Sequence, residues 1–205
     1  MRSPLTRLAG ETVAGIGHNQ GPPLEPGRSW RRHVWKKARA ALVPHLPLEI
    51  VRLRVARARQ LGLSYPTYAS VRLGTGRDIV AFLFTSAALD LPPGAARVPA
   101  RQADHLARLI DCERLLMADV TEADRLREAL VRAHGPLFAA IGPGPDPQAG
   151  LGPGRAAIRA ILDPMKLPGD AVVMIGALAA ERDWADAARL AKFLPAESYF
   201  AEGAT

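Results

Sequence analysis

The chain has 205 residues and 48% hydrophobic content, and its 27 Lys and Arg against 20 Asp and Glu give a formal net charge of +7. This length allows one domain or two small ones, and the composition excludes a wholly disordered protein. Its single cysteine, Cys112, excludes a disulfide framework and a cysteine-rich zinc site. The longest apolar run, residues 171–180, is too short for a membrane span, and the N-terminus lacks the apolar segment of a secretory signal. We therefore expect a cytoplasmic protein.

The positive charge is concentrated in one segment, residues 28–77. This segment holds twelve Lys and Arg residues against the single acid Glu49, a net charge of +11, whereas residues 1–27 are neutral and residues 78–205 carry −4. Such asymmetry favours a polyanionic partner, of which nucleic acid is the commonest. The alternative is that the arginines form the solvated face of ordinary helices.

The N-terminal half predicts a tail followed by helices. Residues 1–27 are rich in Gly and Pro and predict a disordered tail. The spacing of apolar residues, with Ser29 and Ser64 as caps, predicts helices over 30–42, 47–61, 64–73 and 79–89. We take residues 28–91 as one basic helical region.

The proline-rich stretch 92–99 separates this region from a second helical region, residues 100–205. Apolar periodicity predicts helices over 101–118, 121–134, 154–162 and 183–194, with a Pro- and Gly-rich loop at 142–154. The run 171–180 fits either a strand or a buried helix. Because no partner strand is evident, a helix is preferred, and the predicted fold class is all-α and helical bundle-like.

Residues 58–73 resemble the helix-turn-helix of DNA-binding regulators. Ala58 stands four positions before the turn glycine Gly62, and apolar residues occupy the slots that would be buried in that motif. Glycine suits such a turn because it adopts the left-handed conformation without strain. Arg57 departs from the pattern, since it stands where an apolar residue is expected.

The resemblance implies a set of nucleic-acid contacts. The recognition helix would turn four side chains toward the major groove, namely Tyr65, Thr67, Ser70 and Arg72. Three more cations, Arg54, Arg59 and Arg77, would contact phosphates. The Trp- and Arg-rich segment 30–37 supplies three further cations, Arg31, Arg32 and Lys36, while its tryptophans are expected in the core.

The N-terminal sequence also resembles a protein group. Residues 17–23, GHNQGPP, followed by residues 30–38, WRRHVWKKA, are similar to uncharacterised alphaproteobacterial proteins with a GHNxGPP motif. The resemblance extends to residues 77–84. It implies a bacterial setting and transfers no catalytic residue.

No set of residues points to catalysis, a metal site or a cofactor. Cys112 lies between Asp111 and Glu113, which disfavour its thiolate, and the five histidines are scattered. We therefore expect a non-catalytic accessory or regulatory protein, acting in transcription regulation, that binds duplex DNA through residues 28–77. The alternative is a protein–protein adaptor whose basic segment docks on an acidic partner, and homodimer formation stays open.

Overall fold

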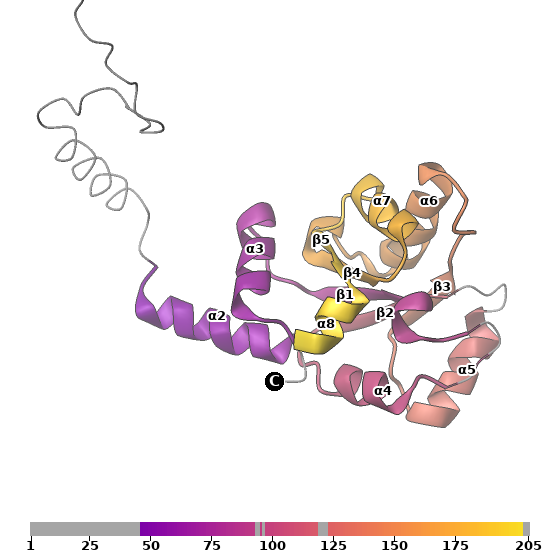
Figure 1. Cartoon of the computed structure of the whole chain (residues 1–205), viewed down its shortest axis with the longest axis horizontal. Helices are drawn as coiled ribbons and strands as arrows, with labels where there is room; N and C mark the ends of the chain where they lie inside the picture. The colour runs from indigo at the N-terminus through magenta and orange to yellow at the C-terminus, as the bar shows by residue number, and fades with distance from the viewer. Residues whose placement is uncertain (1–45, 93–94, 96, 119–122, 203–205) are drawn as a thin grey trace, which may run out of the picture. The chain divides into compact units, whose positions relative to one another are not determined.

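The computed structural model describes residues 46–92, 95, 97–118 and 123–202, and residues 47–205 form one compact unit. Short strands and helices alternate along this part of the chain (Figure 1). The strands are β1 (Ala81–Thr85), β2 (Glu113–Ala118), β3 (Ala140–Pro143), β4 (Val172–Gly176) and β5 (Lys192–Pro195). The helices are α2 (Leu48–Gln60), α3 (Tyr65–Thr75), α4 (Ala100–Ala107), α5 (Ala123–His134), α6 (Leu151–Leu162), α7 (Ala179–Ala187) and α8 (Ala196–Glu202). A 3-10 turn, η1 (Ala87–Leu89), follows β1 directly.

The five strands form one parallel sheet in the order β3-β2-β1-β4-β5. β1 is central, and its Leu83 lies opposite Leu115 of β2 and Met174 of β4. From β1 the chain adds β2 and then β3 on one side of the sheet, and it then returns to add β4 and β5 on the other side of β1. The direction of construction therefore reverses between β1 and β4, as in doubly wound α/β folds.

Both faces of the sheet are covered by helices. Phe82 and Phe84 of β1 point into a core formed with α2, α3, α4, α5 and α8. The alternate residues Ala81 and Leu83 point to the other face, where α6 and α7 pack. Figure 1 shows α6 and α7 on one side of the strands and α4 and α5 on the other. Strands covered on both faces are apolar at consecutive positions, and all five residues of β1 and of β4 are buried.

The predicted all-α class is wrong, because the protein is an α/β fold built on this parallel sheet. The helix predicted at 79–89 contains β1 and η1, and the helix preferred at 171–180 contains β4. The apolar runs that looked helical are strands buried on both faces, which show no alternation by which to recognise them.

Three further predictions are wrong in part. Only the first part of the helix predicted at 101–118 is helical, as α4, and the last part forms β2. The helix predicted at 183–194 likewise gives way to β5, and the predicted loop 142–154 overlaps the end of β3 and the first turn of α6. The two helix predictions each took in a strand, β2 or β5, and the loop prediction took in the end of β3, since a strand of four to six residues has too few positions to show its own period.

Four helix predictions are confirmed, those at 47–61, 64–73, 121–134 and 154–162, with ends shifted by a few residues. The predicted tail 1–27, the helix 30–42 and the contacts Arg31, Arg32 and Lys36 lie outside the described residues. β1, from the predicted basic region, pairs with β2 and β4, from the second region. None of the helices in the described part is both long and apolar enough to cross a bilayer.

Candidate functional site

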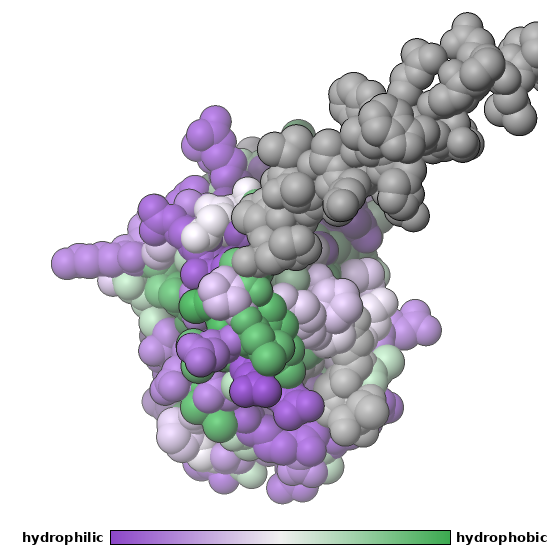
Figure 2. All heavy atoms as spheres, turned by 90° about the vertical axis from the view of Figure 1, so that its left-hand side faces the viewer, coloured by the Kyte–Doolittle hydropathy of each residue, from purple (hydrophilic) through white to green (hydrophobic). Residues whose placement is uncertain are grey.

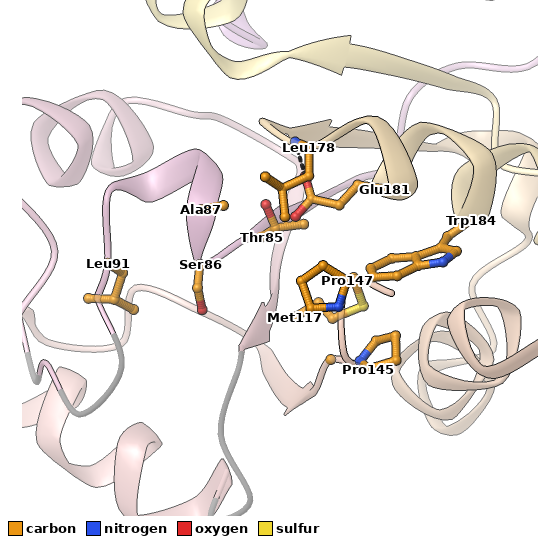
Figure 3. Close-up of a pocket in the computed structure, with 11 residues that line it drawn as sticks. Thr85, Ser86, Ala87, Leu91, Met117, Pro145, Pro147, Leu178, Glu181 and Trp184 are labelled. Carbon is orange, nitrogen blue, oxygen red and sulfur yellow. Dashed lines mark hydrogen bonds between the residues drawn. The ribbon is translucent and has the colours of Figure 1, made fainter. Parts of the chain in front are cut away.

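The carboxyl ends of the parallel strands meet at one edge of the sheet. Ligands of open α/β sheets bind outside this edge, in the crevice where strand construction reverses direction. In this protein that crevice lies at the ends of β1 and β4. A cavity of about 200 Å³ opens there, lined by the ends of β1 and β2, the loop after β3 and the start of α7. Figure 3 shows these segments converging.

The cavity combines apolar walls with a few polar groups. The apolar wall residues are Leu91, Met117, Pro145, Pro147, Leu178 and Trp184. The polar side chains are those of Thr85, Ser86 and Glu181. In Figure 3, Thr85 and Glu181 lie close together, and Trp184 lies beside the two prolines. A mainly apolar cavity with few converging polar groups is typical of a small-molecule site.

The end of β1 holds Thr85 and Ser86 in place through the turn that follows it. Thr85 is buried, and its Oγ1 accepts a hydrogen bond of 3.1 Å from the backbone N–H of Ala88 in η1. The backbone N–H of Ser86 donates to the carbonyl of Met117, 3.1 Å away, so β1 and β2 stay paired at the cavity. The two hydroxyl-bearing residues therefore stand on rigid backbone.

Glu181 is a charged residue with only 3% of its surface exposed. Its Oε2 accepts backbone N–H bonds from Ala177 at 2.7 Å and Leu178 at 2.9 Å, which caps the start of α7. The close approach of the Glu181 carboxylate to the end of β4 needs a glycine there, because a Cβ on Gly176 would lie 2.5 Å from Oε2 of Glu181. Glu181 is thus a fixed carboxylate at the crevice.

Trp184 forms one wall of the cavity and is 3% exposed. Its indole lies against Gly154 of α6, where a Cβ would overlap the ring. Gly154 therefore lets α6 and α7 approach closely enough to hold the indole at the cavity. The wall depends on contact between two helices that are about thirty residues apart in sequence.

The titratable groups that line the cavity limit the chemistry that its own side chains can supply. Among the described lining residues, Glu181 is the single titratable side chain. General acid–base catalysis needs a group free to exchange protons with the substrate, and nucleophilic catalysis needs a base beside the nucleophile. Oε2 of Glu181 caps α7, and no second titratable group accompanies Glu181 in the described lining.

The surroundings of Cys112 disfavour its thiolate. It lies outside the cavity, and its Sγ contacts the backbone carbonyl of Glu113 at 3.6 Å. Burial raises the pKa of its thiol to about 12, against smaller opposing effects of Arg57 and Arg114. Its thiol is therefore protonated at neutral pH.

The described residues hold no group of three or more His, Cys, Asp or Glu suited to a metal.

The predicted helical pair around residues 58–73 is present as α2 and α3. Gly62 adopts the left-handed φ of +63°, and the Ser64 side chain accepts the backbone N–H of Thr67, as expected of the turn and the cap. The slots predicted to be buried are buried, namely Ala58, Leu61, Leu63, Tyr68 and Val71. Local geometry of this kind does not test DNA binding, which stays a prediction.

Arg57, which departs from the helix-turn-helix pattern, ties α2 to the α/β body. Its guanidinium binds the Asp78 carboxylate at 3.0 Å and donates to the backbone carbonyls of Ile79, Ile110 and Asp111. Those partners flank β1 and β2. The helical pair is therefore a part of this fold rather than a free-standing module.

The structure divides the predicted nucleic-acid contacts. Ser70 accepts a hydrogen bond from Nζ of Lys192 at the start of β5, and Arg77 pairs with Asp170 just before β4. Tyr65, Thr67 and Arg72 are half-buried on α3, and Thr67 bonds to Ser64. Arg54 and Arg59 lie on α2, and no carboxylate of the described residues pairs with either.

Figure 2 shows the side of the molecule on which α2 and α3 lie in Figure 1, with a hydrophobic patch bordered by hydrophilic side chains. Three exposed apolar residues of α2 are Leu48, Ile50 and Leu53, and Leu73 of α3 is exposed as well. Contiguous exposed apolar surface with a polar border is a feature of protein interaction sites.

Sequence reasoning missed the cavity residues Thr85, Ser86, Glu181 and Trp184. The available signal was a hydroxyl pair directly after the apolar run 79–84. This hydroxyl pair indicates a ligand site only if the run is a strand, because ligand sites form at the carboxyl ends of parallel strands. Glu181 and Trp184 come from a helix about a hundred residues later, so their proximity is a tertiary effect.

Comparison with protein-family models, curated proteins and solved structures finds no match to this chain. The comparisons therefore assign no function, and they give no support to DNA binding or transcription regulation. The resemblance of residues 17–23 and 30–38 to alphaproteobacterial proteins stays a prediction.

Proposed function

We propose that this protein binds a small organic molecule in the cavity at the carboxyl ends of β1 and β2, beside the start of α7, without catalysing a reaction on it. The observation that supports this function is that the cavity lies at the carboxyl end of β1, the strand at which the strand order reverses, and is lined there by the segment that follows β4. The two features are independent, since one is a property of side chains and the other of chain connectivity.

The construction of the cavity also supports binding. Its polar groups stand on the ends of the central strands and on a helix start, which are rigid elements. Glycines at 154 and 176 allow the close approaches that position Trp184 and Glu181. A site held in shape before the ligand arrives loses less entropy on binding.

A cavity-blocking variant tests this function. Ala87 lines the cavity and is half-buried, so Ala87→Phe should fill part of it and abolish binding of small molecules identified by ligand-observed NMR. Ala156 is exposed on α6 and does not line the cavity, so Ala156→Phe is the matched control and should bind as the wild type does. Equal binding by both variants would contradict the proposal.

A second candidate function is binding of duplex DNA through α2, as the sequence predicts. The observation that favours it is the presence of three arginines on α2, Arg52, Arg54 and Arg59, with no carboxylate partner among the described residues. Unpaired arginines attract phosphates and release counterions from DNA. The alternative partner is an acidic protein. The exposed Leu48 and Leu53 favour it, because a protein surface can pack against leucine side chains and phosphate groups cannot.

A mobility-shift assay with duplex DNA tests this second function. Affinity should fall about 10³-fold between 50 and 200 mM salt if six phosphates are contacted. The double variant Arg54→Glu and Arg59→Glu should lose the shift, whereas reversal of the exposed Arg132 and Arg155 on α5 and α6 should keep it. Absence of a shift by the wild-type protein at 50 mM salt would exclude DNA binding.

Binding of an acidic protein and binding of DNA should respond differently to substitution of Leu53, which is 67% exposed. Leu53→Ser should weaken binding of a protein partner and leave DNA binding unchanged, because leucine contributes to packing and not to phosphate contact. Loss of DNA binding in Leu53→Ser would show that the two surfaces are not separable.

A further inference from the structure

We infer that the cavity at the ends of β1 and β2 selects a small amine and rejects phosphates and carboxylates. The inference deepens the proposed function and rests on it. The ammonium group would bind the Glu181 carboxylate, and an apolar body would lie against Trp184 and Met117. Three features of the described cavity support this choice, namely its charge, its backbone and its walls.

The charge of the cavity favours a cation. Glu181 is the one charged side chain among the described lining residues. Both of its backbone hydrogen bonds end on Oε2, and no donor of the described residues binds Oε1. A ligand N–H can therefore reach Oε1, whereas an anionic group would face a carboxylate without a compensating cation.

The nearest cation in sequence, Arg182, does not compensate Glu181. Its guanidinium carbon lies 4.7 Å from the ring centroid of Phe193 on β5, and Arg182 is not among the lining residues. A guanidinium held over an aromatic face is attracted by the negative charge of that face. The cation is thus engaged elsewhere, and the carboxylate remains the dominant charge of the described lining.

The backbone after β1 does not suit a phosphate. Phosphate-binding turns at this position of doubly wound folds use glycines, which let the backbone N–H groups approach the anion. Here the turn reads Thr85, Ser86, Ala87 and Ala88, and the N–H of Ala88 already donates to Thr85 Oγ1. The loop after β3 and the start of α7 contribute no basic residue to the lining.

The walls and the size define the rest of the ligand. Trp184 and Met117 are each 3% exposed, and with Pro145 and Pro147 they offer flat apolar surface (Figure 3). A volume of about 200 Å³ admits a single ring or a short branched chain bearing one polar end. An indole face beside a carboxylate also attracts a cation, because the ring face is negative.

A charge series on one ring tests the inference. The compounds are benzylamine, benzyl alcohol and benzoate, with inorganic phosphate as a fourth probe, titrated into the full chain. The substitutions Trp30→Phe and Trp35→Phe leave Trp184 as the sole tryptophan of three, so its fluorescence reports the cavity. Benzylamine should bind about tenfold more tightly than benzyl alcohol, and benzoate and phosphate should not bind.

Glu181→Gln, made in the same background, tests the role of the carboxylate. The amide oxygen of Gln can still accept the backbone N–H groups of Ala177 and Leu178, so the start of α7 keeps its cap. This variant should bind benzylamine and benzyl alcohol about equally. Glu197→Gln removes an exposed carboxylate on α8 and should keep the amine preference.

The outcomes separate the inference from the proposed function. Tighter binding of benzoate or phosphate than of benzylamine overturns the amine inference and leaves ligand binding at the cavity standing. An amine preference that survives Glu181→Gln also overturns it. If none of the four compounds changes the Trp184 fluorescence, both the inference and the proposed function fail.

Discussion

The helical pair α2–α3 and the strand-end cavity hold their polar side chains in opposite ways. On α2, Arg52 and Arg59 are exposed and lie within two turns of one helix. In the cavity, Thr85 and Glu181 are buried and come from segments about a hundred residues apart. The first arrangement needs only helix periodicity, and the second needs the whole sheet. Changes to the protein should therefore act locally on α2 and cooperatively at the cavity.

The largest expected effect is at the helix contact behind the cavity. Gly154→Ala places a methyl group where the Trp184 indole packs, so it should lower the free energy of unfolding by about 3 kcal/mol. Gly74 of α3 has no atom within 4 Å of the position of a Cβ, so Gly74→Ala should raise that free energy by up to about 1 kcal/mol. Urea denaturation measures both. A mild effect of Gly154→Ala would show that the cavity wall is adaptable rather than tightly packed.

A smaller effect is expected where α2 joins the body. Arg57→Ala removes a guanidinium that binds five partners, so it should lower the free energy of unfolding by about 2 kcal/mol. Arg59→Ala removes an exposed side chain of the same helix and should change the free energy of unfolding by less than about 0.5 kcal/mol. Urea denaturation again gives both values. Equal effects would mean that α2 is held by its apolar contacts alone.

The smallest expected effect concerns the turn between α2 and α3. His105 of α4 packs beneath this turn, with its Nε2 2.7 Å from the position of a Cβ on Gly62. This Nε2 has no hydrogen-bond partner among the described residues. Burial, with smaller effects of Arg108 and Arg101, lowers the pKa of His105 below 6.5. The unfolded chain then binds more protons than the native state below pH 6.5, so stability should fall as the pH drops through 6.5 and level off below the native pKa.

Denaturation curves between pH 5 and 8 measure this dependence. His105→Gln removes the titrating group and should flatten the wild-type curve over this interval. The described residues contain one other histidine, His134, whose Nε2 accepts the backbone N–H of Val98. A variant curve as steep as that of the wild type would assign the pH dependence to other groups.

The prediction from sequence succeeded where structure is local. The cap at Ser64, the left-handed turn at Gly62 and the buried face of α3 follow from residues within a few positions of one another. No strand was preferred, and only the run 171–180 was left open to one, because a short apolar run such as 81–85 fits a buried helix as well as a strand covered on both faces. The hydrogen bonds that decide between them come from β2 and β4, both distant in sequence.

By itself the sequence determined the concentration of charge in residues 28–77, the two helices that carry part of it and the turn that joins them. These depend on composition and on periodicity within a helix. Only the tertiary structure decided that Arg57 is a tie to the body, that Ser70 and Arg77 have partners near β5 and β4, and that Thr85, Glu181 and Trp184 share a cavity. The physical reason is that pairing between parallel strands, unlike hydrogen bonding within a helix, joins residues whose distance along the chain is arbitrary.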